Sequence, residues 1–248
     1  MSTDALRRLT AAEFILFLRD KVGPIFGLLF PTALLCVFGN INFFTDPKNG
    51  IDGQPLLYTY TPILVGFVIA MLAINTLPPT LATYREQGVL RRLRTTPVGP
   101  ARVLAAQFVI CLATALVSVV LLLAVARLAF DVPLPRQPVA FALSAVLAAL
   151  ALIGIAVLVA AVTPTGKAAN AIGSVLFYVM MFFAGLWLPI EAMPPVLRHV
   201  SEATPLGAAV QALSDATAGD WPPAWRLLLL GGYVVVTALL GVRLFRWE

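Results

Sequence analysis

The stretch VAFALSAVLAALALIGIAVLVAAV at residues 139–162 contains no charged side chain. The hydrocarbon core of a bilayer is about 30 Å thick, and an α-helix needs roughly 20 apolar residues to cross it. The strands of a membrane barrel alternate between apolar and polar residues, whereas this stretch is continuously apolar. It therefore predicts a membrane-spanning α-helix.

Five further apolar runs lie on either side of this stretch. They predict spanning helices at residues 22–44, 56–81, 103–126, 168–190 and 224–245. The last run is the shortest, but Arg226 and Arg243 at its ends can extend their charges toward lipid headgroups. The chain is 60% apolar and 12% charged, whereas a soluble domain is about half apolar and about a quarter charged. We therefore predict one all-helical integral membrane domain over residues 1–248, with six transmembrane helices.

The distribution of basic residues predicts the orientation of these helices. Twelve of the 17 lysines and arginines lie in the N-terminal segment, the second and fourth loops and the C-terminal tail, and five lie in the other loops. Basic residues accumulate on the cytoplasmic side of membrane proteins. We therefore expect a multi-pass protein of the cell membrane with both termini in the cytoplasm. The net charge of +5 is then a consequence of topology, and nucleic acid is not expected as a partner.

Two segments lie outside the spans but are not ordinary loops. Residues 1–21 place Leu6, Leu9, Ala12 and Leu16 at helical spacing, which favours a helix in the cytoplasmic interface over a disordered tail. Residues 191–223 are too rich in proline and polar groups to span the membrane, and too apolar for a solvated loop. We expect two short helices there, half sunk in the outer interface as a re-entrant hairpin between the fifth and sixth spans.

The chain lacks the groups that an intramembrane enzyme needs. His199 is the single histidine, so neither a Ser–His pair in the membrane nor a histidine-based metal site is expected. The sequence TPTGKA at residues 163–168 resembles a phosphate-binding loop, but it lacks the first glycine and the hydroxyl after the lysine. We therefore predict no catalytic site, no metal and no cofactor on this chain, and expect a partner to supply the energy.

An aromatic and methionine-rich stretch lies in the fifth predicted span. Adaptable side chains of this kind suit a bulky apolar ligand, although they also serve ordinary helix packing. Together with residues of the second span, where Pro62 and the pair Pro78 and Pro79 are expected to bend the helix, they form a candidate substrate path. Its members are Phe67, Met71, Asn75, Phe177, Met180, Met181 and Phe183.

The loop at residues 82–102 contains the sequence REQGVLRRLRTTP at residues 85–97. A second motif, FAGLWLP at residues 183–189, is followed by Met193 and Pro194 and then by Thr204, Pro205 and Leu206. The two motifs, in this order and spacing, resemble those of ABC-2 type transporter permeases, including permeases of the daunorubicin-resistance type. The resemblance covers nearly the whole chain.

The resemblance implies partners and roles. A coupling helix would dock into a cytoplasmic ATP-binding cassette subunit, which is present in two copies and binds the ATP and Mg²⁺. Its residues would be Tyr84, Arg85, Glu86, Gln87, Gly88, Val89, Leu90, Arg91, Arg92 and Leu93. Arg85 and Glu86 would fix this helix to the ATPase or to the interfacial helix. The outer gate would contain Leu188, Pro189, Met193 and Pro194.

The resemblance also implies that a second permease copy pairs with this chain, so that spans two and five of each copy face a central path. A simpler interpretation of the basic loop is that it only sets topology and attracts anionic lipid. Charge alone, however, does not account for Glu86, Gln87 and Gly88 or for the leucine spacing.

Several functions remain open at this point. The favoured one is ATP-driven export of a hydrophobic small molecule such as a drug or antibiotic, which would make the chain part of a multidrug efflux system. Export of a lipid or a lipid-linked glycan is the alternative. An intramembrane enzyme is disfavoured by the missing catalytic groups, and a membrane scaffold that transports nothing would have no partner ATPase.

Overall fold

The computed structural model describes residues 27, 29–50, 53–89, 92 and 100–244. Within these residues the chain forms helices joined by loops, without a β-strand. In this described part, five helices are long and apolar enough to cross a membrane, and they match predicted spans two to six. Their ranges are Leu56–Glu86, Arg102–Phe130, Pro138–Val162, Gly166–Phe183 and Ala224–Gly241.

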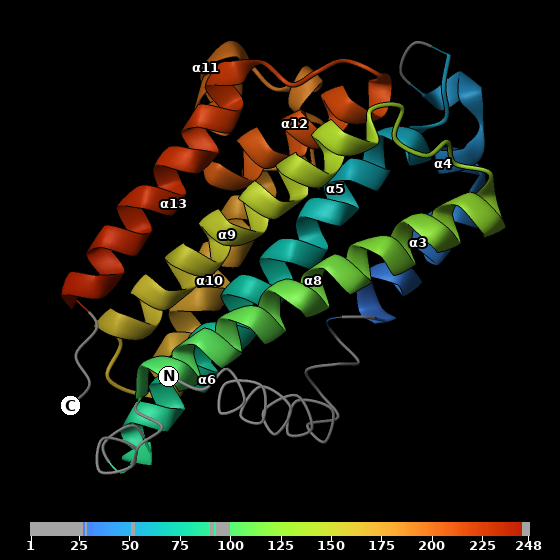
Figure 1. Cartoon of the computed structure of the whole chain (residues 1–248). Coiled ribbons are helices and arrows are strands. Elements are labelled where there is room, and N and C mark those ends of the chain that lie inside the picture. The colour runs from blue at the N-terminus through green and yellow to red at the C-terminus, as the bar shows by residue number, and fades with distance from the viewer. Residues whose placement is uncertain (1–26, 28, 51–52, 90–91, 93–99, 245–248) are drawn as a thin grey trace.

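The long helices lie side by side in one bundle (Figure 1). They are α5 (Leu56–Ala70), the π-helical turn η3 (Met71–Thr76), α6 (Leu77–Glu86), α8 (Pro100–Phe130), α9 (Pro138–Val162), α10 (Gly166–Phe183) and α13 (Ala224–Leu244). The ends of α6, α9 and α13 and the beginnings of α8 and α10 gather at one end of the bundle, at the lower left of Figure 1. This end is called the α6 end below.

Helix α9 occupies the centre of the bundle. It packs against α13, α12 (Pro205–Ala218), α6, α8 and α5, and its buried face is made largely of alanines. Small residues let neighbouring helix backbones approach closely, which replaces the hydrophobic driving force that is missing between helices in lipid. At Gly154 a Cβ atom would collide with Thr237 Oγ1 of α13, so the two backbones are in close contact there.

The second span differs from its predicted form. It continues beyond residue 81 to Glu86, where the sequence predicts a loop, and it contains the π-helical turn at Met71–Thr76. Pro78 has no N–H to donate to the carbonyl of Ile74, and such breaks often coincide with π-turns. Helix α5, by contrast, continues through Pro62.

The first predicted span is interrupted in the structure. Helix α3 (Phe30–Gly39) ends at Asn40, Ile41 is extended, and the short helix α4 (Asn42–Thr45) follows. The Asn40 side chain donates a hydrogen bond from Nδ2 to the Cys36 carbonyl at 2.8 Å. Asparagine side chains compete with the backbone in this way and favour helix ends. The single helix predicted for residues 22–44 is therefore wrong in its last five residues, from Asn40 on. Residues 22–26 and the predicted interfacial helix at 1–21 lie outside the described residues.

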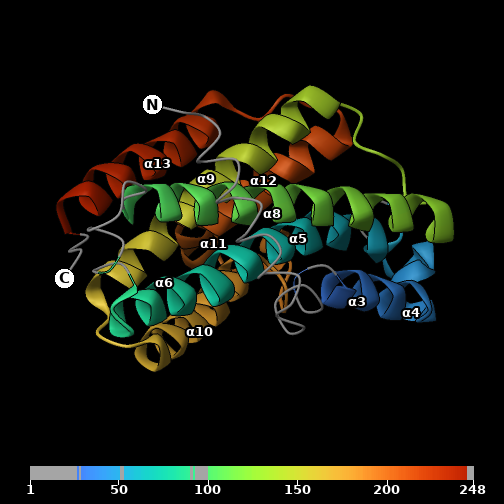
Figure 2. The same ribbon diagram turned by 60° about the horizontal axis from the view of Figure 1, so that its bottom comes forward.

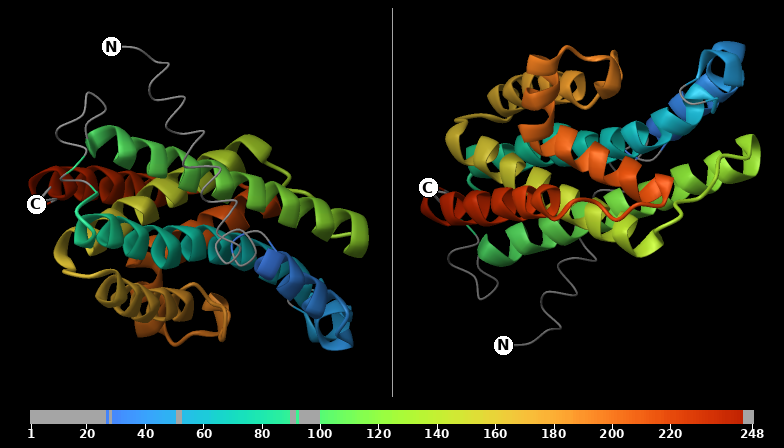
Figure 3. Two further views of the ribbon diagram at one scale, coloured as in Figure 1. Left: turned by 90° about the horizontal axis from the view of Figure 1, so that it is seen from below. Right: turned by 90° about the horizontal axis from the view of Figure 1, so that it is seen from above.

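Helix α3 packs against the first half of the second span, and α10 packs against its second half. Helix α3 packs against α5, and α10 packs against α6 and η3, as seen in Figure 2 and from below in Figure 3. Phe67 of α5 joins the two sides, because its ring contacts Phe30 of α3 at a centroid distance of 5.9 Å and Phe177 of α10 at 5.4 Å.

The segment between α10 and α13 contains a 3-10 turn at Ile190–Ala192 and the two helices α11 (Pro195–Ala203) and α12 (Pro205–Ala218). Helix α12 is buried against α9, α5 and α13, whereas Ser201 is the buried residue of α11. The Tyr233 hydroxyl of α13 donates to the Ala203 carbonyl at the hairpin tip, at 3.0 Å. With a rise of 1.5 Å per residue, this contact places the tip roughly 14 Å along α13. The hairpin therefore inserts between the long helices.

Candidate functional site

The last turn of α6 carries Arg85, whose guanidinium reaches another part of the chain. Arg85 Nη1 donates to the Ala161 carbonyl at 3.1 Å, and Nη2 donates to the Thr163 carbonyl. These carbonyls belong to the C-terminal end of α9, where backbone acceptors lack partners inside the helix. A cation at this position also complements the negative end of the helix dipole. Arg85 therefore caps α9.

Glu86 follows directly and caps the next helix. Its Oε2 atom accepts a hydrogen bond from the backbone N–H of Gly166, the first residue of α10, at 3.0 Å. A carboxylate at a helix N-terminus complements the positive end of the helix dipole. Thr165 adds a second cap, since its hydroxyl accepts from the Ala168 N–H at 3.2 Å. The turn between α9 and α10 is thus held from both sides by the end of α6.

These contacts give Arg85 and Glu86 partners within the chain itself. The resemblance implied that both residues fix the coupling helix to the ATPase or to the interfacial helix, but in the structure their charged groups contact the α9–α10 turn of the same chain. Both belong to the end of α6 rather than to a separate helix, because α6 extends to Glu86 and Gln87 is its C-cap. Gly88 has φ +67°, a left-handed conformation that glycine adopts without strain at helix ends.

The other described residues of the predicted docking segment differ in exposure. Tyr84, Gly88 and Val89 are half-buried, and Gln87 and Arg92 are exposed. Leu90, Arg91 and Leu93 lie outside the described residues. The described part of the docking segment therefore begins at the α6 end, beside the α9–α10 turn.

The same contacts bear on the sequence that resembles a phosphate-binding loop. A phosphate loop presents free backbone N–H groups to its ligand. Here the Gly166 and Ala168 N–H groups are already bonded to Glu86 and Thr165, while Lys167 is exposed. The segment acts as a capped turn between two helices.

The predicted substrate-path residues divide into two groups. Phe177, Met180 and Met181 of α10 are buried in the core together with Phe67, at exposed fractions of 7% or less. Met71, Asn75 and Phe183 are half-buried. The Asn75 Oδ1 atom is buried and has no hydrogen-bond partner among the described residues.

A polar stripe on the open face of α10 was not predicted as part of the path. Asn170, Ser174 and Tyr178 follow one another at four-residue spacing, so they share one side of the helix. Asn170 and Tyr178 are exposed, and Ser174 is half-buried. The sequence prediction weighed the types of residue in this span, whereas the helical phase of these three residues could have identified the stripe.

On an adjacent side of the helix, at Gly173, α10 lies close to the second span. A Cβ atom at Gly173 would be only 2.7 Å from the carbonyl oxygen of Ile74 in η3. This carbonyl is the one to which Pro78 cannot donate an α-helical hydrogen bond. A glycine at this position therefore lets α10 pack directly against the irregular backbone of the second span.

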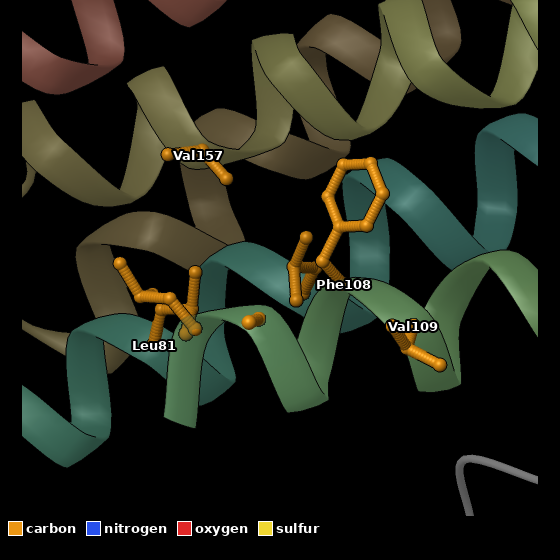
Figure 4. Close-up of a pocket in the computed structure, with 7 residues that line it drawn as sticks. Leu81, Phe108, Val109 and Val157 are labelled. Atoms are coloured by element: carbon orange, nitrogen blue, oxygen red, sulfur yellow. The ribbon is translucent and has the colours of Figure 1, made fainter. Parts of the chain in front are cut away.

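An apolar groove lies between α6, α8 and α9 near the α6 end (Figure 4). It has a volume of about 320 Å³ and is lined by Leu77, Leu81, Leu104, Ala105, Phe108, Val109 and Val157. None of these residues was named as a site residue from the sequence, because an apolar lining has the same composition as a lipid-facing surface. The groove can accommodate an acyl chain or another apolar group.

The predicted outer gate lies between α10 and α11. Leu188 and Pro189 are half-buried, Met193 is buried and Pro194 is exposed. Further on, each of the two hairpin helices is tied to another helix. Ser201 Oγ donates to the Phe183 carbonyl at 2.5 Å, and Arg226 of α13 forms a salt bridge with Asp215 of α12. The described residues contain no group of three potential metal-ligating side chains.

Comparison with known sequences identifies the family. The sequence model described as ABC-2 type transporter matches residues 4–217. The chain belongs to the ABC-2 type transporter family. It is also similar to the protein of Bacillus subtilis (strain 168) described as "Putative transport permease YvfS", with 23% identity over 238 residues, which cover 96% of this chain and 95% of that protein.

Membership of the ABC-2 family confirms the resemblance drawn from the two motifs. The match and the apolar helices together make the chain a multi-pass membrane protein of the permease type. Permeases of the ABC-2 family generally work with an ATP-binding subunit. The α6 end, with its capped turn and the docking segment, is therefore the candidate functional site.

Proposed function

We propose that this chain is the transmembrane subunit of an ATP-driven exporter that moves a hydrophobic small molecule, such as a drug or antibiotic, out of the cell. The main support is the position of the docking segment. Its described part begins at the α6 end, where α6, α8, α9 and α10 meet (Figure 1). A cytoplasmic ATPase that binds there can move several helices at once.

In this proposal the ATPase binds Gln87, Val89 and the basic and leucine residues up to position 93, and hydrolyses ATP with Mg²⁺ on its own side of the interface. Reversing the charges of Arg91 and Arg92 to glutamate should abolish co-purification with the ATPase and stimulation of its activity. Lys48→Glu is the matched control, because Lys48 is an exposed cation in the loop before α5, at the opposite end of the bundle. Unchanged assembly and stimulation in the Arg91 and Arg92 variant would contradict the docking proposal.

The exposed polar face of α10 supports a substrate path that lies where this chain contacts a second permease copy. Exposed polar side chains on a spanning helix usually face a protein partner or a water-filled cavity, because lipid offers them no hydrogen bonds. Asn170 and Tyr178 are such side chains. Asn75 in the second span, with its unbonded Oδ1 atom, is a further polar group for this path.

The outer hairpin supports a gate at the other end of the path. The tip of α11 and α12 reaches Tyr233 within α13, and Trp187, Trp221 and Trp225 on the same end are about half exposed. Exposed tryptophans favour the membrane interface. We therefore place the hairpin as a re-entrant element in the outer leaflet and the α6 end in the cytoplasm.

Export of a lipid or a lipid-linked glycan is the second candidate, and the apolar groove is the observation that favours it. The groove opens between α6, α8 and α9 and could guide an acyl chain (Figure 4). ATP hydrolysis by the reconstituted complex should be stimulated by hydrophobic drugs under the first proposal and by lipid-linked sugars or phospholipids under the second. Uphill transport by this chain without any ATPase would exclude both.

A further inference from the structure

We propose that Arg85 and Glu86 lock the end of α6 to the α9–α10 turn, so that movement applied to the docking segment is passed to α10 through these two side chains. The inference rests on the proposed function, because it states how force from the ATPase reaches the helix that carries the polar stripe. Arg85 and Glu86 act here as positioning residues.

The chemistry of the contacts supports a rigid link. Arg85 bonds to two carbonyls with a planar guanidinium, which fixes orientation as well as distance. Glu86 bonds to a backbone N–H on the other side of the same turn. The two side chains are adjacent and opposite in charge, and each matches the helix end that it caps. The three groups that they contact, the Ala161 and Thr163 carbonyls and the Gly166 N–H, belong to the backbone. The two side chains therefore connect α6 to the backbones of α9 and α10.

Close packing reinforces the link. Gly166 is buried at the start of α10, and a Cβ atom there would collide with Thr83 Oγ1 and lie 3.3 Å from the Pro79 carbonyl of α6. The first residue of α10 therefore rests directly on α6. Along this part of the bundle α6 cannot advance toward α10 without displacing it, since closely packed protein interiors transmit strain.

On its other side, α6 has a much looser neighbour. Helix α8 contacts α6 at few positions, and the apolar groove lies between Leu77 and Leu81 of α6 and the start of α8 (Figure 4). Movement of α6 relative to α8 is therefore resisted less than movement relative to α10. We infer that α6, the α9–α10 turn and the beginning of α10 move as one body.

The transmitted movement reaches the polar stripe directly. Asn170 lies one turn beyond Gly166, and Ser174 and Tyr178 follow on the same face. At Gly173 the helix again contacts the second span. Displacement at the α6 end would therefore change the position of the stripe rather than be absorbed at the turn.

The first test measures the link itself. Spin labels at Thr80 of α6, a half-buried residue outside the docking segment, and at the exposed Lys167 of α10 should give one narrow distance distribution in the reconstituted complex. That distribution should be the same with and without ATP. A distance that changes when ATP binds would overturn the proposal, whatever the transport activity, because the two segments would then move independently.

The second test measures the consequence for coupling. Replacing both Arg85 and Glu86 by alanine should lower the ratio of substrate transported to ATP hydrolysed by roughly 10-fold, within the usual range of coupling between sites. The same replacement should broaden the distribution of spin-label distances. Arg85→Lys keeps the charge but not the two-pronged geometry, and should recover part of the ratio. Arg127→Ala, which removes an exposed arginine paired with Asp131 within its own segment, should leave the ratio unchanged.

The two tests separate this inference from the proposed function. If the unmodified complex transports nothing with ATP, the proposed function fails, while the spin-label distance still reports on the lock. If the complex transports and the double alanine variant keeps the full ratio of transport to hydrolysis, the lock is refuted. Should the double variant not fold, Arg85→Lys and Glu86→Gln provide the same comparison with smaller changes in side-chain volume.

Discussion

Gly173→Ala should destabilise the protein, although replacing a helical glycine by alanine usually does the opposite. The new Cβ atom would lie 2.7 Å from the Ile74 carbonyl oxygen, whereas comfortable carbon–oxygen contacts begin at about 3.3 Å. The two backbones must therefore separate by roughly 0.6 Å, because a backbone carbonyl cannot rotate away as a side chain can. Added atoms in a packed core cost about 1–3 kcal/mol.

The matched control is Gly232→Ala on α13, where a Cβ atom would meet nothing within 4 Å. Both variants gain the higher helix propensity of alanine, about 0.8–1.0 kcal/mol. The propensity terms cancel, so the difference between the two variants isolates the steric cost of about 1–3 kcal/mol. For a chain of this length each kcal/mol corresponds to about 2–4 °C in Tm. Gly173→Ala should therefore melt about 2–12 °C below Gly232→Ala.

The measurement is the fraction of monodisperse protein that survives heating in detergent, followed by size-exclusion chromatography. Because membrane proteins often unfold irreversibly, all variants must be heated at one rate and compared with each other. Equal melting temperatures for the two variants, or a higher value for Gly173→Ala, would refute the close contact between α10 and the second span.

Three further predictions concern other contacts. Arg226→Ala should lower the free energy of unfolding by about 1–3 kcal/mol, because Asp215 loses a charged hydrogen-bond partner. The double variant Arg226→Ala, Asp215→Ala should be only slightly less stable than Arg226→Ala in the same melting assay. Gly154→Ala should destabilise the α9–α13 contact, and Thr237→Ala should recover part of the loss by removing the colliding hydroxyl; failure of this rescue would contradict the packing. A cysteine at Lys167, in a background without the two native cysteines, should react with a membrane-impermeant maleimide only from the cytoplasmic side, and labelling from outside would invert the proposed orientation.

The spans were predictable because the signal is local. The helix expected at residues 139–162 is α9 at Pro138–Val162, and the one expected at 168–190 begins at Gly166 and ends at Phe183. The largest errors lie where a polar residue decides the outcome. Asn40 ends α3 before the apolar run is complete. Helix α6 extends beyond the predicted span to include Arg85 and Glu86, whose side chains find partners at the ends of α9 and α10.

In the candidate site, too, local sequence features were predictable and contacts between distant residues were not. The docking segment could be recognised as a motif in sequence, but the neighbours of Arg85 and Glu86 could not be. Their partners Ala161 and Gly166 are 76 and 80 positions away along the chain. Which face of α10 stays exposed is decided by the helices that pack against it. The residue types in this span alone could not predict that face.

The sequence by itself determined that this chain is a bundle of membrane helices of the ABC-2 family, since the free energy of placing a helix in lipid is close to a sum over its own residues. The tertiary structure decided which helices meet, where the second span becomes irregular, and that the arginine and glutamate of the family motif cap two helices of the same chain. Those features depend on backbone groups and close contacts contributed by distant segments, and no local sum over residues contains them.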